Sequence, residues 1–229
     1  MSVRLPRQIV VSPLYFIVAF CLFGCNPSSP KGNEGDPAEG YRVLSDDPLY
    51  PLFDPYSIPE EPVFDIVTTM GTIRVKLYSE TPLHRDNFAR LAAGRVLEGT
   101  LFHRVIDGFM IQGGDPGTKD PATPQEEYGM RDLGYWIPAE FVDALRHTKG
   151  ALAAAREGDD INPDKASSST QFYLVQSEDG CRHLDGSYTV FGQTLEGIDV
   201  IDAIAKVPRN GMDVPDEPVR ILSVNLVRD

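Results

Sequence analysis

The chain has 229 residues, 41% of them hydrophobic, and a formal net charge of −13 at pH 7. This composition is typical of a folded protein with one substantial domain, and the acidic balance argues against nucleic-acid binding, which usually needs a basic surface. The three cysteines, Cys21, Cys25 and Cys181, supply neither a disulfide framework nor a CxxC metal site. The four histidines are scattered without metal-ligand spacing, so we expect no metal and no cofactor.

The N-terminus has the features of an export signal. Arg4 and Arg7 precede an apolar run over residues 9–23 that is too short to span a bilayer comfortably. The run closes with Leu22-Phe23-Gly24-Cys25, which resembles the bacterial lipobox; a plain secretory signal with an incidental cysteine is the alternative. We expect residues 1–24 to be a lipoprotein signal peptide. Lipidated Cys25 would then anchor the protein in the bacterial cell envelope, on the periplasmic side or at the surface.

Residues 25–60 form an acidic, proline-rich stretch. Dense proline removes backbone donors, and the early part lacks large apolar residues, so we expect a tether rather than a packed element. Such a tether can hold a domain away from a membrane, or it can be a leader of no consequence. Later apolar residues such as Leu52 and Phe53 offer a third possibility, packing against the domain.

Residues 61–229 show the pattern of a folded domain. Apolar alternation around Met70-Gly71 predicts a β-hairpin, and Thr81-Pro82 predicts a helix start with threonine as N-cap and Gly94 as the stop. A second helix is predicted over residues 198–207. Further strands are predicted at residues 101–106, 109–112, 151–155, 172–176, 189–193 and 219–227. Many short strands and two helices favour a mainly β fold, a closed antiparallel barrel capped by the helices.

The most informative segment runs from Phe102 to Asp115. In an extended strand Met110 and Gln112 share one face, and a turn at Asp107-Gly108 can bring Arg104 back beside them. The product is an apolar patch with a permanently charged guanidinium at its rim. The segment carries no acidic nucleophile, serine dyad or metal cluster, which suits a reaction that changes geometry without breaking a bond.

Five blocks in order resemble the cyclophilins, the peptidyl-prolyl cis/trans isomerases. The resemblance covers most of residues 62–229 and implies an eight-stranded barrel with two helices. The blocks are Phe102-His103-Arg104, Gly108-Phe109-Met110-Ile111-Gln112-Gly113-Gly114-Asp115, Lys149-Gly150-Ala151-Leu152-Ala153-Ala154-Ala155-Arg156, Ser169-Thr170-Gln171-Phe172-Tyr173, and Leu184-Asp185-Gly186 leading to Thr189-Val190-Phe191-Gly192.

The resemblance also implies roles for single residues. Arg104 matches the catalytic arginine of the family, and Gln112 can orient both that guanidinium and the peptide. The positions that match the proline pocket are Phe109, Met110, Tyr173 and Leu184. Those that match the peptide groove are Gln112, Ala155, Arg156 and Gln171, and Tyr188 matches a pocket-edge position that is often histidine.

Three departures from the family pattern bear on substrate preference. His183 stands where many cyclophilins carry tryptophan or another large aromatic residue, and Tyr173 replaces the commoner phenylalanine. Residues 117–136 do not resemble the glycine-rich loop found there in many members. With imidazole at position 183, we expect weak cyclosporin binding.

The sequence thus favours a monomeric isomerase that acts on X-Pro bonds in unfolded or flexible envelope proteins. One alternative is a binding module that holds proline-containing segments as a chaperone without catalysis. A weaker one is a small-molecule-binding barrel like a lipocalin, against which the charged groove residues argue. The run Ser167–Thr170 is expected to be a loop rather than a nucleophile site, and His103 and His147 are expected to be structural or solvent-facing.

Overall fold

A computed structural model describes residues 57–228 of the chain. The predicted signal peptide, Cys25 and nearly all of the predicted tether lie outside these residues. Within them, no helix combines the length and the apolar character needed to cross a bilayer.

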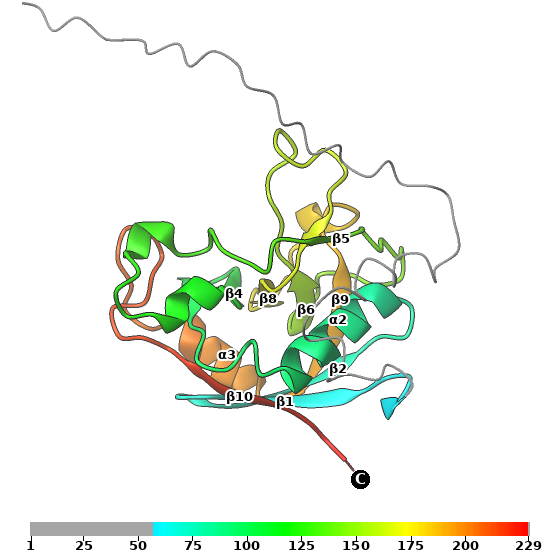
Figure 1. Ribbon diagram of the computed structural model, residues 1–229, viewed down its shortest axis with the longest axis horizontal. Helices are drawn as coiled ribbons and strands as arrows, with labels where there is room; N and C mark the ends of the chain where they lie inside the picture. The colour runs from blue at the N-terminus through cyan, green and yellow to red at the C-terminus, as the bar shows by residue number, and fades with distance from the viewer. Residues whose placement is uncertain (1–56, 229) are drawn as a thin grey trace, which may run out of the picture. The chain divides into compact units, whose positions relative to one another are not determined.

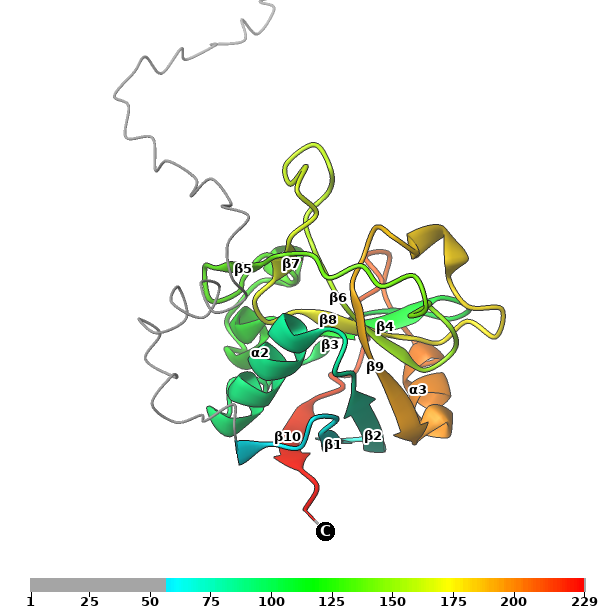
Figure 2. The ribbon, with the colours of Figure 1, turned by 90° about the vertical axis from the view of Figure 1, so that its right-hand side faces the viewer.

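Eight strands form one antiparallel sheet in the order β10-β1-β2-β9-β6-β8-β4-β3. Figure 2 shows the strands between helices α2 (Pro82–Ala93) and α3 (Ile198–Ala205), which lie on opposite sides. The strands are β1 (Val63–Thr68), β2 (Gly71–Leu77), β3 (Phe102–Ile106), β4 (Met110–Gly113), β6 (Ala151–Ala154), β8 (Phe172–Val175), β9 (Val190–Glu196) and β10 (Ile221–Leu226).

The prediction of a closed barrel is wrong, because the sheet is an open half-barrel (Figure 1). Its edge strands β3 and β10 form no ladder and meet only near an isolated bridge between Leu101 and Arg220. Beyond that bridge β3 leaves β10, since the Val105 N–H donates to the carbonyl of Asp213 in the preceding loop, at 2.9 Å. The two edges are therefore joined by hydrogen bonds only around that bridge, for example from the Phe102 N–H to the Val219 carbonyl at 2.9 Å.

The predicted hairpins and helices are confirmed with small changes at their ends. Val63–Thr68 pairs with Gly71–Leu77. β3 turns into β4 through Gly108, whose positive φ of 80° is favourable for glycine because glycine has no Cβ. A short second sheet was not predicted. It pairs β5 (Trp136–Ile137) with β7 (Ser167–Ser168), part of the serine run expected to be a loop. Two-residue strands carry too little alternation to be found by pattern.

The start of α2 is capped by a distant residue. Thr81 occupies the N-cap position as predicted, but its side chain makes no capping hydrogen bond. Instead the Glu140 carboxylate accepts from the Leu83 and His84 backbone N–H groups, both at 3.0 Å. A carboxylate there satisfies orphan donors and complements the helix dipole. The helix is thereby tied to the loop before β6.

The same carboxylate lies in a Ser–His–Glu chain. His84 Nδ1 is 2.7 Å from Glu140, and His84 Nε2 is 2.9 Å from the Ser167 hydroxyl. Ser167 is 1% exposed, so the hydroxyl is out of reach of a substrate. The chain joins α2 to β7 and is structural.

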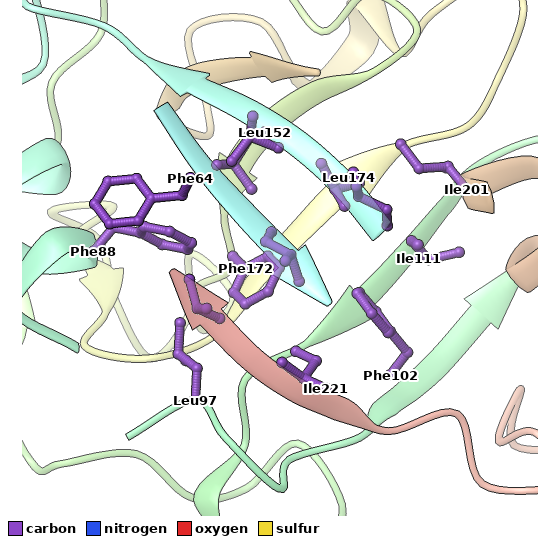
Figure 3. Packing of buried hydrophobic residues seen from close by; sticks show 14 of the residues in the cluster. Phe64, Phe88, Leu97, Phe102, Ile111, Leu152, Phe172, Leu174, Ile201 and Ile221 are labelled. Atoms are coloured by element: carbon purple, nitrogen blue, oxygen red, sulfur yellow. The ribbon is translucent and has the colours of Figure 1, made fainter. Parts of the chain in front are cut away.

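Alternating side chains divide the sheet into two apolar faces. One face forms the main core between the helices and includes Ile111, Leu152, Phe172 and Leu174, all 0–2% exposed. Figure 3 shows aromatic rings from different elements meeting there, with Phe88 of α2 edge-on to Phe172 at 5.7 Å between centroids. The intervening residues point to the other face, where a second cluster forms.

Candidate active site

The second face carries a row of residues that the strand register sets side by side. Arg104 of β3 pairs with Gln112 of β4, which pairs with Tyr173 of β8, which pairs with Ala153 of β6. Directly paired residues of antiparallel strands share a face. The predicted return of Arg104 beside Gln112 is therefore confirmed, and Tyr173 joins them from 61 positions further along the chain than Gln112.

A cavity of about 140 Å³ opens on this row. It combines apolar walls with two guanidinium groups and one amide. Its nine residues lie on β3, β4 and β8, on the turn into β4, and in the segments after β6 and before β9. They are Arg104, Phe109, Met110, Gln112, Ala155, Arg156, Tyr173, Leu184 and Tyr188. All nine were predicted as site residues, and the structure brings them together.

Arg104 presents free donors to this cavity. Its guanidinium makes no hydrogen bond to any residue in 57–228, and its nearest charged neighbour is Asp213, with Nε and Oδ2 3.9 Å apart. At that distance the two groups form an ion pair, but they are too far apart for a hydrogen bond. With 44% of the side chain exposed, the planar fork of five N–H donors is available to a ligand.

Gln112 is oriented through a second amide. Gln171 Nε2 donates to the carbonyls of Gly129 and Arg131, at 2.9 and 3.0 Å, so its Oε1 faces the opposite way. That oxygen accepts from Gln112 Nε2 at 3.1 Å. Because a carbonyl can only accept, the order of donors fixes both amides. Gln112 is left with Oε1 as an acceptor beside Arg104.

Tyr173 is held from behind by a buried histidine. The Asp185 carboxylate can only accept a hydrogen bond, so His147 Nδ1 carries the proton and donates to it at 2.8 Å. His147 Nε2 then accepts from the Tyr173 hydroxyl at 2.9 Å. Burial lowers the pKa of His147, although the hydrogen bond and charge of Asp185 act in the opposite direction. The lowered pKa favours the neutral ring. Burial also raises the pKa of Tyr173 well above its usual range.

The hydrogen-bonded chain Tyr173–His147–Asp185 also reaches a second part of the cavity wall, at Leu184. Burial disfavours the charged form of Asp185, but hydrogen bonds from the backbone and ring of His147 outweigh it and lower the pKa of Asp185. Asp185 directly follows Leu184, which ends the 3₁₀ turn Arg182–Leu184. Hydrogen bonds through His147 therefore link this turn to the tyrosine hydroxyl. His147 was expected to be structural or solvent-facing, and at 1% exposure it is structural.

Arg156 is a wall of the cavity rather than a free cation. Its Nε donates to the Ser187 carbonyl at 2.7 Å, its Nη1 to the Glu157 carbonyl at 2.8 Å, and its Nη2 pairs with Asp159 at 2.7 Å. The guanidinium also lies 4.5 Å from the ring centroid of Tyr188. These contacts leave Arg104 as the cation available at this cavity.

His183 lies beside the cavity and does not line it. Its exposed ring stacks on Phe109, with 6.0 Å between centroids and 30° between planes. The residue therefore supports the outer side of Phe109. Its predicted role in substrate binding would act through that ring.

A larger cavity of about 410 Å³ adjoins the first and shares Gln112, Ala155 and Arg156 with it. Gln171 lines this second cavity. The rim of this larger cavity includes Met130, Trp136 and Ile161, which are 71, 52 and 63% exposed. Two of the three come from residues 117–136, the stretch that departs from the family pattern. Sequence spacing offered no signal for this rim, because loop backbone decides where these side chains point.

Among residues 57–228, no group of histidine, cysteine, aspartate or glutamate is arranged to hold a metal ion. The described site thus offers a cation, an amide and apolar walls. Such a site can bind an uncharged, partly apolar ligand and donate hydrogen bonds to one of its atoms.

Comparison with known proteins identifies the chemistry. The family profile "Cyclophilin type peptidyl-prolyl cis-trans isomerase/CLD" matches residues 63–226. The chain belongs to the cyclophilins. A peptidyl-prolyl cis-trans isomerase of Acinetobacter baylyi is 36% identical over 172 residues, 71% of this chain and 84% of that protein. Peptidyl-prolyl cis-trans isomerase-like 3 of Dictyostelium discoideum is 35% identical over 164 residues, 69% of this chain and 91% of its relative.

Solved structures show the same fold. A crystal structure of a cyclophilin-type isomerase from Cryptosporidium parvum superposes with a TM-score of 0.63 at 24% identity, covering 74% of this chain and 99% of that one. A second structure, determined in the presence of the dipeptide Ala-Pro, gives a TM-score of 0.62 at 23% identity, over 73% and 99% of the two chains. The family profile and the relatives show that this cyclophilin is a peptidyl-prolyl cis-trans isomerase, and the solved structures show the family fold.

Proposed function

We propose that this cyclophilin isomerises X-Pro bonds in unfolded or flexible envelope proteins while a lipid on Cys25 holds it at a membrane. The observation that supports the catalytic part is the 140 Å³ cavity with Arg104 at its edge. The support for the location is the sequence of the first 25 residues. The two parts are independent and are tested separately.

The proline ring occupies the apolar cavity. Phe109, Met110, Tyr173 and Leu184 receive the pyrrolidine without needing polar complementarity. Burial there removes water from the imide, which strengthens any hydrogen bond made to it. The neighbouring amide and guanidinium hold the polypeptide on one side of the bond while the other side rotates.

Arg104 stabilises the twisted transition state. Rotation about the X-Pro bond breaks amide resonance, and the prolyl nitrogen regains a lone pair that accepts a hydrogen bond. A guanidinium N–H donates to that nitrogen more strongly as the bond twists, which lowers the barrier of about 20 kcal/mol. Reaching millisecond turnover from about 100 s requires roughly 7 kcal/mol. A charged hydrogen bond contributes about 1.5–3 kcal/mol, and desolvation and fixation contribute the rest.

A protease-coupled assay on a proline peptide tests this assignment. Arg104→Ala should lower turnover by more than about tenfold while the fold survives. Arg104→Lys should recover little, because an ammonium is strongly hydrated and lacks the planar fork. Arg95→Gln, which removes an exposed guanidinium that does not line the cavity, is the matched control. Unchanged turnover in Arg104→Ala would refute the mechanism, and peptide binding without acceleration would favour the chaperone alternative.

The location is tested by lipid labelling. When the full chain is produced in a bacterial host with radiolabelled palmitate, the mature protein should carry label and sediment with membranes. Cys25→Ser should lose both properties, whereas Cys21→Ser, which falls in the segment proposed to be removed, should keep them. Label retained in Cys25→Ser would contradict lipidation at this residue.

A further inference from the structure

Arg104 lines two cavities. It borders the proline-sized cavity and also a third cavity, of about 360 Å³. Gln112 borders both, while Met212 and Val214 line the third cavity and not the proline-sized one. A long side chain without hydrogen bonds to the described residues can turn into either cavity. The fraction of molecules with the guanidinium in the catalytic orientation is then reduced.

Asp213 is the charged group that lies against this guanidinium. Its Oδ2 is 3.9 Å from Arg104 Nε, so the attraction acts at the inner edge of the fork and leaves the two terminal nitrogens free. The other carboxylate oxygen accepts from Arg209 Nε at 3.2 Å. With 35% of the Asp213 side chain exposed, solvent screens the pair only in part.

The backbone of Asp213 is tied to the strand that carries Arg104. Its carbonyl accepts from the N–H of Val105, the residue next to Arg104, at 2.9 Å, and its own N–H donates to the Asn210 carbonyl at 3.1 Å. Asn210 Oδ1 also accepts from the N–H groups of Met212 and Val214. The carboxylate is therefore presented from a cross-linked turn and not from a free loop.

The conformation of Asp213 is one that few side chains adopt. Its φ of 63° lies in the left-handed region, which aspartate and asparagine tolerate better than most residues. This backbone conformation aims the carboxylate at Arg104 while the carbonyl bonds to β3. Asparagine at this position preserves the backbone and removes only the charge.

We propose that Asp213 is a positioning residue, which restrains the guanidinium of Arg104 at the mouth of the proline cavity. The proposal deepens the proposed function and rests on the role of Arg104 there. Asp213 does not touch the substrate. Its effect on the rate passes through the orientation of Arg104, since misplacing a catalytic group by about 1 Å can cost orders of magnitude in rate.

The test measures kcat and KM of the full chain for a proline peptide. Asp213→Asn should lower kcat by about three- to tenfold with KM within about twofold, because the apolar cavity is unchanged. Asp213→Glu, which keeps the charge, should recover part of the loss. Asp216→Asn removes the same charge from an exposed position of the same loop and should leave kcat unchanged.

A double-mutant cycle separates positioning from a structural role. If Asp213 acts through Arg104, then Asp213→Asn should have no further effect on the rate in the Arg104→Ala background. An equal loss in both backgrounds, or a kcat of Asp213→Asn within twofold of the unchanged protein, would overturn the proposal.

A spectroscopic readout keeps this result independent of the proposed mechanism. In ¹⁵N NMR spectra the Arg104 Nε–Hε signal should move in Asp213→Asn and stay in place in Asp216→Asn. If Arg104→Ala proves fully active, the catalytic assignment of Arg104 fails, and this signal alone decides the ion pair. A signal that does not move in Asp213→Asn would overturn the positioning role.

Discussion

The two faces of strands β4, β6 and β8 are both apolar, and they differ in what covers them. On the inner face Ile111 and Leu174 are fully buried, in a core to which both α2 and α3 contribute residues. On the outer face Met110 and Tyr173 are nearly as buried, yet both line a cavity together with Leu184 of the turn Arg182–Leu184. Complete coverage contributes stability, whereas incomplete coverage leaves apolar surface for a ligand to bury.

The difference predicts opposite consequences for neighbouring residues. Alternation puts Phe172 on the inner face and Tyr173 on the outer one, and it does the same for Ala154 and Ala155. Substitutions on the inner face should therefore act on stability, and those on the outer face should act on substrate handling.

The largest expected effect is on the inner face. Phe172→Ala should lower the free energy of unfolding by about 3–5 kcal/mol, because a fully buried ring leaves a cavity that the neighbouring rings do not fill. Phe172 meets Phe88 and Phe102 edge-on at 5.7 and 6.2 Å between centroids. Urea unfolding measures the loss. Leu222→Ala, at a half-exposed position of β10, is the control and should cost far less; a similar loss in both variants would contradict the distinction.

A matched pair on β6 and its end compares the faces directly. Ala154→Leu overpacks the core and should cost about 1–3 kcal/mol of unfolding free energy. Ala155→Leu fills the substrate cavity instead, and should lower kcat/KM by about fivefold or more while stability changes by less than about 1 kcal/mol. Denaturation and the isomerase assay on both variants measure this. If Ala155→Leu is the less stable variant of the two, the proposed difference between the inner and outer faces is wrong.

A smaller, pH-dependent effect is expected at the start of α2. Asp86 is 4% exposed and its Oδ2 makes no hydrogen bond within residues 57–228. Burial, helped by the charge of Glu140, raises the pKa of Asp86 to about 7. Because the folded-state pKa is raised, the folded state loses stability as pH rises from about 4 through 7.

Asp86→Asn removes that loss. The variant should be more stable than the unchanged protein by about 1–3 kcal/mol at pH 8, and the difference should shrink towards pH 4. The bond that Arg85 Nε donates to Asp86 Oδ1 at 2.7 Å can be kept by the amide oxygen. Unfolding at both pH values measures the effect. The control is Asp143→Asn, at an exposed position, which should change the free energy of unfolding little at either pH. If Asp86→Asn gains no more stability at pH 8 than this control, Asp86 does not carry a destabilising buried charge.

Much of the fold follows from local patterns. The alternation around Met70-Gly71 and the turn at Asp107-Gly108 predict hairpins that the structure contains, because side-chain period and turn chemistry act over a few residues. The barrel closure was wrong for the opposite reason. Whether β3 bonds to β10 or to Asp213 depends on a loop more than a hundred residues away, and no local pattern reports that choice.

The helix cap shows the same limit. Thr81 has the residue type of an N-cap, and the pattern placed the helix start correctly. The carboxylate that satisfies the first N–H groups belongs to Glu140, more than fifty residues away. Propensity predicts that a cap is needed and not which residue supplies it.

The residues that have the chemistry of the site can be read from the amino-acid sequence. An arginine, an amide and apolar side chains at strand spacing, in blocks similar to a known family, are readable without coordinates. How those groups are held became visible in the folded protein: Gln171 orients Gln112, His147 holds Tyr173, and Asp213 lies beside Arg104. The reason is physical, since residue type and period are local properties of a chain, whereas a hydrogen bond or ion pair depends on the folded path that brings distant residues together.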